Sequence, residues 1–357
     1  MTCLVAVLLV GVAGSAGSGT ATTAPLPLHG NGDIAVALGR NLLAVNPSHP
    51  GVMRGIASCP QGTGCEIDEP AWSPRGRKLA FVQGAFAVNH PSHMFLYVMA
   101  HGRGPRQLAS CGSCGRAWGA RLGWSPNGKW VAFSRDGFHT GKDTLWIVPV
   151  SGGKPHRLTH CRTRCDDLNP SWSPDGHVLV YEHIAGSSTS LYTIRSDGSD
   201  PTKIALGADP QWSPDGRSIV FEDARGIEVA DGHGSGVHLL YAQTGGAGPG
   251  VPSWSPDGTK LVFFNTPGGP SHYTAEVWTM NADGSDQRSL YQSGCCVGDW
   301  AAPIWSPDGR MIAFSADSAG GTFVINADGS GLEELGPDQA SYGLSSMSWQ
   351  PLNVRVF

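Results

Sequence analysis

Short stretches in which apolar and polar residues alternate recur along most of the chain, and turns rich in Gly, Pro, Asn and Asp separate them. The pentapeptide WSPDG, or a close variant of it, begins at Trp72, Trp124, Trp172, Trp212, Trp254 and Trp305. An aromatic residue follows each of these Trp residues nine positions later. Because Asp-Gly and Asn-Gly favour tight turns, each copy predicts a hairpin of two antiparallel strands.

Each repeat then continues with a variable loop, a third apolar strand, a second turn centred on Gly, and a fourth strand with one apolar anchor. We take as anchors Leu108, Leu158, Ile204, Leu239, Leu290 and Leu335. Four antiparallel strands in every 40 to 50 residues or so are typical of β-propeller blades.

The two ends of the chain complement each other. The segment SMSWQPL at 346–352 repeats the first strand around Trp349 but has no partner strand after it. Near the N-terminus, second, third and fourth strands are predicted at 34–38, 41–45 and 52–57. Joined in one composite blade, these strands would close the ring and leave no open sheet edge. We therefore predict an all-β fold, a single seven-bladed propeller domain at residues 30–357, with six blades as the alternative.

The hairpin explains the pentapeptide without any reaction. We expect the seven Trp residues to be buried between blades, and we assign the turn residues Asp175, Asp215, Asp257 and Asp308 to architecture.

These features closely resemble the TolB-like propeller repeats of bacterial envelope proteins. The resemblance rests on WSPDG, on DGS in the later turn, and on a Pro two positions before most of the repeat Trp residues, and it covers roughly residues 30–352. The second repeat departs from it, with Leu122 in place of that Pro. The resemblance implies a propeller and an envelope or extracellular setting. Such repeats also occur in peptidases, lyases and binding proteins, so the activity stays open.

Composition and charge narrow the setting. Residues 4–12 form an apolar run too short to span a bilayer, and small residues follow it, so residues 1–24 are interpreted as a secretory signal peptide with an uncertain cleavage site. No other segment is predicted to cross a membrane, and we expect a secreted or envelope protein. The formal net charge is -5 and no basic stripe occurs, which argues against a nucleic-acid partner.

Beyond Cys3, the cysteines fall into four close pairs: Cys59 and Cys65, Cys111 and Cys114, Cys161 and Cys165, Cys295 and Cys296. Each pair lies between the fourth strand of one blade and the Trp strand of the next, and these connections share one face of a propeller. We call it the cysteine face. Local disulfides are the favoured hypothesis in an exported chain, although the pairing stays open. Cys111-x-x-Cys114 is also half of a zinc motif, but no second half with matching spacing follows.

Several histidines map to loops on the same face: His90, His93, His139, His183 and His272. Propeller lyases that act on acidic sugars bind a metal with histidines over the central channel, so this set is the best enzymatic candidate. The alternative is that these side chains are simply solvated.

Charged residues crowd the same connections, and we take Asp166, Asp167, Asp299, Arg116 and Arg121 as candidate binding residues. Other carboxylates nearby are Glu66, Asp68, Glu69 and Asp209, with Arg162 and Arg164 as further cations. They could form a polar binding surface or be solvated loop charges.

Two hypotheses about function follow. The first is a secreted, non-enzymatic module that binds a protein or glycan through the cysteine face, with no cofactor. The second is a metal-dependent polysaccharide lyase or hydrolase that uses the loop histidines. The chain contains no Gly-x-Ser-x-Gly and little sequence after Trp349, which argues against a serine hydrolase domain.

Overall fold

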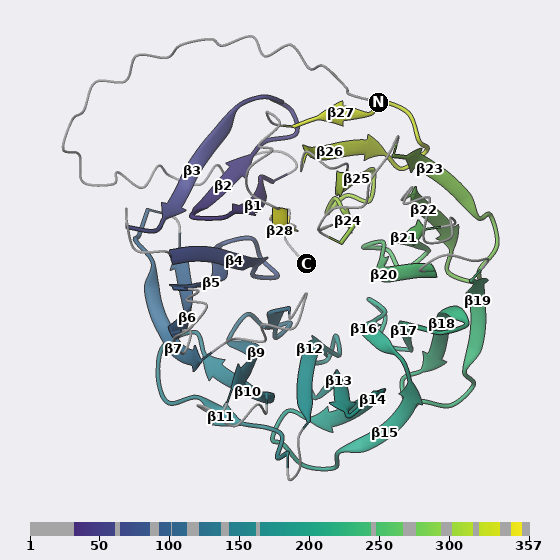
Figure 1. Cartoon of the computed structure of the whole chain (residues 1–357), viewed down its shortest axis with the longest axis horizontal. Coiled ribbons are helices and arrows are strands. Elements are labelled where there is room, and N and C mark those ends of the chain that lie inside the picture. The colour runs from purple at the N-terminus through teal and green to yellow at the C-terminus, as the bar shows by residue number, and fades with distance from the viewer. Residues whose placement is uncertain are drawn as a thin grey trace, which may run out of the picture.

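The computed structural model describes residues 32–60, 65–85, 93–100, 102–112, 121–136, 143–161, 165–243, 248–266, 276–293, 302–316, 321–335 and 344–351. Within these residues, 28 strands form seven sheets of four strands each. The sheets are arranged as blades around a central axis (Figure 1). The predicted all-β propeller is therefore confirmed, with seven blades rather than six. In the described part of the chain, no helix has the length and apolar character needed to cross a bilayer.

From the axis outward, the strands of the first three blades are as follows. Blade 1 contains β28 (Leu344–Trp349), β1 (Ile34–Leu38), β2 (Asn41–Val45) and β3 (Met53–Ser58). Blade 2 contains β4 (Cys65–Trp72), β5 (Lys78–Ala85), β6 (His93–Ala100) and β7 (Arg106–Gly112). Blade 3 contains β8 (Gly123–Trp124), β9 (Trp130–Asp136), β10 (Asp143–Pro149) and β11 (His156–Arg157).

The remaining four blades follow the same order. Blade 4 contains β12 (Asp166–Trp172), β13 (Val178–Ala185), β14 (Ser188–Arg195) and β15 (Thr202–Leu206). Blade 5 contains β16 (Ala208–Trp212), β17 (Ser218–Asp223), β18 (Gly226–Asp231) and β19 (His238–Ala242). Blade 6 contains β20 (Gly248–Trp254), β21 (Lys260–Thr266), β22 (Glu276–Asn281) and β23 (Arg288–Gln292). Blade 7 contains β24 (Ile304–Trp305), β25 (Met311–Ala316), β26 (Gly321–Asn326) and β27 (Glu333–Glu334).

Blade 1 is the predicted composite of the two chain ends. β28 pairs antiparallel with β1, and Trp349 lies opposite Ile34. The Gln350 side chain extends this seam, because its Oε1 accepts a hydrogen bond from the backbone of Asp33 and its Nε2 donates to the carbonyl of Gly76 at 2.7 Å. A Cβ atom at Gly76 would lie 2.4 Å from the carbonyl oxygen of Pro351. The hairpin turn of blade 2 thus packs against the C-terminal segment only because residue 76 is Gly.

The turn residues have the structural role that the sequence predicts. In blade 4, Ser173 Oγ donates to Asp175 Oδ1 at 2.6 Å, and the same oxygen accepts the backbone N–H of His177. The Ser173 hydrogen bond is the main reason that the pKa of Asp175 is lowered. Asp215, Asp257 and Asp308 accept the matching serine hydroxyl at the same distance. These carboxylates are therefore occupied in holding their hairpins.

The repeat Trp residues connect neighbouring blades. Five of them are buried, namely Trp72, Trp124, Trp172, Trp305 and Trp349, whereas Trp212 and Trp254 are partly buried. The indole Nε1 of Trp124 donates to the carbonyl of Ala71, and that of Trp172 to the carbonyl of Gly123, in each case one blade back. Trp254 and Trp305 donate in the same way. The indole Nε1 atoms of Trp72, Trp212 and Trp349 are instead buried without a partner among the residues that the structure describes, so packing between blades is what the repeat Trp residues share.

One predicted anchor is wrong. Leu239 is exposed, and its neighbour Leu240 is buried. The pairing of β18 with β19 skips Leu240, because Glu228 lies opposite Leu239 and Ile227 opposite Tyr241. The same irregularity occurs at Leu108, Ile204 and Leu290. The extra residue of a bulge in the outer strand is thus the one that turns inward, and hydrophobicity alone did not identify it in blade 5.

Candidate functional site

The disulfides lie on the cysteine face, as predicted. Cys59, just after β3, is bonded to Cys65 at the start of β4, and their Cα atoms are 5.7 Å apart. Cys161 and Cys165, between β11 and β12, form a second disulfide with Cα atoms 5.9 Å apart. Cys111, at the end of β7, is also disulfide-bonded. Each of these positions connects the outer strand of one blade to the inner strand of the next.

Much of the predicted site falls outside the described residues. These residues are Cys114, Cys295, Cys296, His90, His139, His272, Asp299 and Arg116. His93 begins β6, but its side chain is not among those described. The described candidates are His183, Asp166, Asp167 and Arg121, and they can be placed in the fold.

His183 and Asp167 form a close pair on adjacent strands of blade 4. They lie directly opposite each other on β13 and β12, and His183 Nδ1 is 2.7 Å from Asp167 Oδ1. The Asp167 side chain is 3% exposed and that of His183 29% exposed. The pair occupies Nδ1 of the imidazole, which leaves Nε2 as its other functional nitrogen.

The surroundings of the pair are partly apolar. Burial is the main cause that raises the pKa of Asp167, while hydrogen bonds from Thr159 and His183 oppose it. The ring of Tyr192 meets the imidazole edge-on, with centroids 5.2 Å apart. The backbone carbonyl of Asp167 accepts a hydrogen bond from Ser134 Oγ of blade 3. A buried carboxylate therefore orients a partly exposed imidazole.

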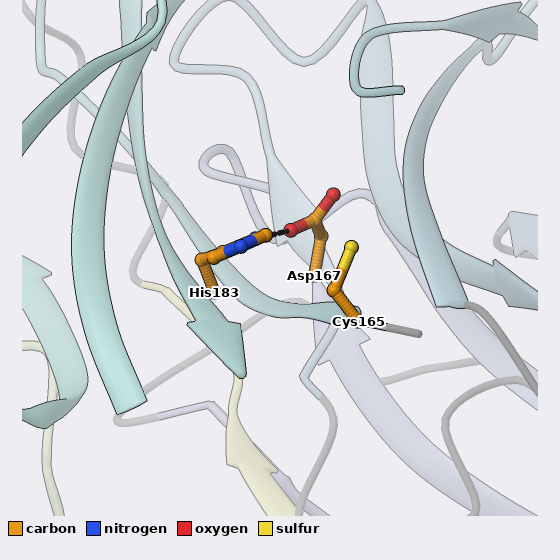
Figure 2. A group of neighbouring side chains, drawn as sticks. All are labelled: Cys165, Asp167 and His183. Atoms are coloured by element: carbon orange, nitrogen blue, oxygen red, sulfur yellow. Dashed lines mark hydrogen bonds and ion pairs between the residues drawn. The ribbon is translucent and has the colours of Figure 1, made fainter. Parts of the chain in front are cut away.

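Cys165 stands beside this pair. Figure 2 shows the His183 ring pointing at the Asp167 carboxyl group, with the Cys165 side chain next to it. One ligand atom from each of the three residues lies within 4.8 Å of the other two. Because the Cys165 sulfur is bonded to Cys161, it is not a thiolate and does not offer the charge that a metal ligand needs.

A second polar group lines the inner strands, which surround the axis (Figure 1). β4, β12, β16 and β20 each contain a register shift. One residue of each shift has a positive φ, although none is glycine: Glu69 (54°), Asn169 (51°), Asp209 (50°) and Val251 (55°). Non-glycine residues rarely adopt this conformation, so these bulges are strained positions that neighbouring groups must hold.

Two glutamates hold two of these bulges, at Asp209 and Val251, each from the second strand of the preceding blade. Glu182 Oε1 accepts the backbone N–H of Asp209 at 2.5 Å and the side-chain amide of Asn169 at 2.8 Å. Glu222 Oε2 accepts the backbone N–H of Val251 at 2.9 Å. These carboxylates thus have a structural task across the blade interface.

Two of the bulge residues, the two glutamates and one arginine form what we call the channel cluster: Glu69, Asp209, Glu182, Glu222 and Arg121. The guanidinium of Arg121 lies 3.4 Å from Asp209 Oδ1, and its attraction also lowers the pKa of Glu69. Burial nevertheless raises the pKa of Glu69 well above its usual value, with repulsion from Asp68 adding to it. Burial, then repulsion from Asp209, raises the pKa of Glu222 to about 8. In the channel cluster, the ionised form of several carboxyl groups is therefore disfavoured.

The structure brings Arg121 close to Asp209 and Asn169, whereas the other three described candidates have other partners. Asp166 accepts a hydrogen bond from the backbone of Asp143, and Asp167 pairs with His183. Sequence reasoning did not single out Glu182 or Glu222. A signal was present, because both follow the repeat aromatic residue at a position where other blades have Val82 or Phe264.

The family model of PD40, the TolB beta propeller domain, matches residues 65–296. Among solved structures, a putative TolB from Agrobacterium tumefaciens is similar at 24% identity and a TM-score of 0.53, covering 78% of this chain and 95% of that one. An oligogalacturonate lyase in complex with manganese is similar at 13% identity and a TM-score of 0.56, covering 89% of this chain and 86% of that one. Likeness at these identities shows the fold alone.

A curated protein of Agrobacterium fabrum, described as uncharacterized, is 26% identical over 192 residues, or 54% of this chain. The chain spans about half the length of that relative, 53% of it. The family model, in contrast, covers more than half of the chain and includes the two disulfide-bearing blades and the channel cluster. The chain belongs to the family of the TolB beta propeller domain.

Proposed function

We propose that this protein is an exported, non-enzymatic binding module that recognises a partner through the cysteine face and the adjoining channel wall. The observation that carries the proposal is the channel cluster, in which four carboxyl groups gather around the guanidinium of Arg121. Burying a carboxylate is unfavourable. Glu182 and Glu222 support bulges of the next blade, but other blades have Val82 or Phe264 at the same position, so a buried carboxyl group there is not a general feature of the repeat.

The charge of this wall favours one class of partner. Burial raises the pKa of several of these carboxyl groups. An approaching Lys or Arg side chain favours their ionised form and gains from it, whereas the uronate groups of acidic polysaccharides disfavour it. A protein with a basic segment therefore fits the channel cluster better than a glycan. The disulfides support export, because they persist in oxidising compartments, and the apolar N-terminal segment supports it as well.

Binding of a fluorescent Lys- and Arg-rich peptide, measured by anisotropy at several salt concentrations, tests the proposal. We expect binding that weakens as salt rises, and a Kd at least about fivefold larger in Glu69→Gln and Asp209→Asn, which corresponds to about 1 kcal/mol. The matched control is Glu333→Gln, which removes the same charge from an exposed position on the outer strand β27. Equal effects of the control and the channel variants, or binding of a neutral glycan in place of the peptide, would contradict the proposal.

A second candidate is a metal-dependent polysaccharide lyase or hydrolase. The His183–Asp167 pair favours it, because a carboxylate that orients an imidazole is a common arrangement in metal sites and in general acid–base catalysis. The fold likeness to an oligogalacturonate lyase with bound manganese adds to it. Product formation from oligogalacturonate in the presence of manganese, lost in His183→Ala, would support this candidate, and an inactive protein without stoichiometric manganese would eliminate it.

A further inference from the structure

The disulfide Cys161–Cys165 is one of two that occupy equivalent places in the repeat. Cys165 precedes Trp172 by seven residues, and Cys65 precedes Trp72 by seven residues. In both blades the bonded partner is the nearest cysteine before the inner strand. Backbone position and loop closure are therefore closely matched between the two sites.

The neighbours of the two disulfides differ in chemistry. Opposite one another on the first two strands of blade 2 are Ile67 and Gln83. The same two positions in blade 4 hold Asp167 and His183. Ile67 is buried and belongs to the apolar cluster between blades 1 and 2. Among the described residues, a group of three potential metal ligands occurs at the blade 4 disulfide and not at the blade 2 disulfide. Only one of the two described disulfides thus has a carboxylate and an imidazole beside it.

Reduction changes what the blade 4 site can hold. A phosphine reductant supplies two electrons and water supplies two protons: the S–S bond between Cys161 and Cys165 breaks, each sulfur gains a proton, and the phosphine takes the oxygen of the water to become its oxide. A zinc ion can then bind both sulfurs as thiolates while their two protons pass to solvent. Together with Asp167 and His183, the two sulfurs make four ligands of the types that zinc prefers.

We propose that blade 4 contains a redox-controlled zinc site, made by Cys161, Cys165, Asp167 and His183, which is closed while the disulfide is intact and opens when it is reduced. Ligand atoms of a tetrahedral zinc site lie about 3.5 Å apart, given metal–ligand distances of about 2.0 to 2.3 Å. Ligand atoms of three of these residues already lie within 4.8 Å of one another. Three of the four ligands are therefore already gathered, and the sulfur of Cys161, which the disulfide holds beside that of Cys165, is the fourth.

The proposal is independent of the binding function above, and it departs from the sequence-based expectation that no cofactor is bound. It also differs from the lyase hypothesis, which needs manganese in the oxidised protein. Reduction removes the covalent bond that closes the loop between blades 3 and 4. Zinc bound under these conditions would link the start of β12 to β13 and so stabilise this region locally.

Zinc content tests the proposal on the full-length protein. The protein is dialysed against zinc with or without a phosphine reductant, and bound metal is measured by mass spectrometry. We expect substoichiometric zinc in the oxidised protein, about one further zinc per chain after reduction, and at least a tenfold weaker zinc affinity in His183→Gln, which copies the residue of blade 2. The matched control is Gln83→Ala, which should leave zinc binding unchanged.

Alkylation of the wild-type protein identifies the sulfurs that bind zinc. The test therefore does not depend on a variant that could fail to fold. In the reduced wild-type protein, zinc should slow the alkylation of Cys161 and Cys165, as read by peptide mapping, but not that of Cys59 and Cys65. Equal protection of both pairs, or no bound zinc after complete reduction, would overturn the proposal. Loss of peptide binding in the anisotropy experiment would leave this result unaffected, so the two proposals can fail separately.

Discussion

Blades 2 and 4 share one design, and the pair of side chains behind the disulfide is where their chemistry differs most clearly. Each opens with a disulfide to the preceding connection, a strand that shifts register, and a Trp-led hairpin. In blade 2 the strand pair behind the disulfide carries Ile67 and Gln83, and in blade 4 it carries Asp167 and His183. The backbone repeat thus supplies a fixed position, and the side chains at that position decide whether it contributes to the core or to chemistry.

The difference also bears on stability. Ile67 adds apolar burial to the core, whereas Asp167 is a buried carboxylate whose pKa is raised by desolvation. At this position blade 4 therefore keeps a residue that is less favourable for folding than the Ile67 of blade 2. Proteins commonly give up some stability at positions that have a function. Variants that exchange or remove the residues of blades 2 and 4 show how far the two blades are alike.

The largest effect is expected when blade 2 receives the carboxylate of blade 4. Ile67→Asp should lower the free energy of unfolding by roughly 3 kcal/mol or more, because it removes buried apolar surface and buries a charge beside an amide. Chemical denaturation measures the change. Adding Gln83→His should recover part of the loss by rebuilding the pair. A single variant as stable as the wild type would show that this position in blade 2 is not the counterpart of the one in blade 4.

Removal of either disulfide should have a smaller and similar effect. Replacing both cysteines by Ser should cost about 2 kcal/mol in each blade, because the bonds close short loops with sequence separations of 6 and 4 residues. Thermal or chemical unfolding of the two double variants side by side tests this. If one pair contributes several times more than the other, chain entropy is not the main source of its stabilisation.

His183→Gln gives blade 4 the polar residue of blade 2 and should cost about 1 to 2 kcal/mol at neutral pH. The raised pKa of Asp167 means that the folded protein holds this proton more tightly than the unfolded chain does, so stability falls as pH rises above the ordinary pKa of Asp. Because His183 lowers the pKa of Asp167, the free energy of unfolding of His183→Gln should fall more steeply with pH than that of the wild type. Unfolding curves between pH 4 and 8 measure it, and an unchanged slope would mean that the pair is not coupled.

The smallest change in stability is expected from Glu222→Gln in the channel cluster. Its effect depends on pH in a range that overlaps with that of the Asp167 effect in blade 4. Because the pKa of Glu222 is raised to about 8, the group contributes stability below pH 4.5 that is lost as pH rises through 8. Glu222→Gln cannot ionise, so its advantage over the wild type should grow across that window to at least about 1 kcal/mol. The same unfolding series measures this, with Glu333→Gln as a control that should show no such trend. If the free energy of unfolding of Glu222→Gln and that of the wild type change in parallel with pH, the raised pKa of Glu222 is contradicted.

Sequence reasoning reached the fold more fully than the site. The six Trp-led hairpins and the seam at Trp349 could be predicted, because each depends on residues close in sequence or on a repeated pattern. Leu239 shows where that reasoning fails, since a bulge in β19 turned Leu240 inward and the two residues are chemically the same. The channel cluster was missed in part for a related reason, because Glu182 and Glu222 act on backbone groups of the next blade.

The sequence by itself determined the six Trp-led hairpins, since tight turns and alternating strands are encoded within a few residues, and it favoured seven blades over six with the two chain ends joined in one blade. Tertiary structure alone decided which polar groups meet. Strand register placed Asp167 against His183, 16 residues apart, and blade packing placed Glu182 under Asp209, 27 residues apart. A shift of one residue would turn either side chain to the other face of its sheet, which is why the chemistry of this protein can be read only in the folded chain.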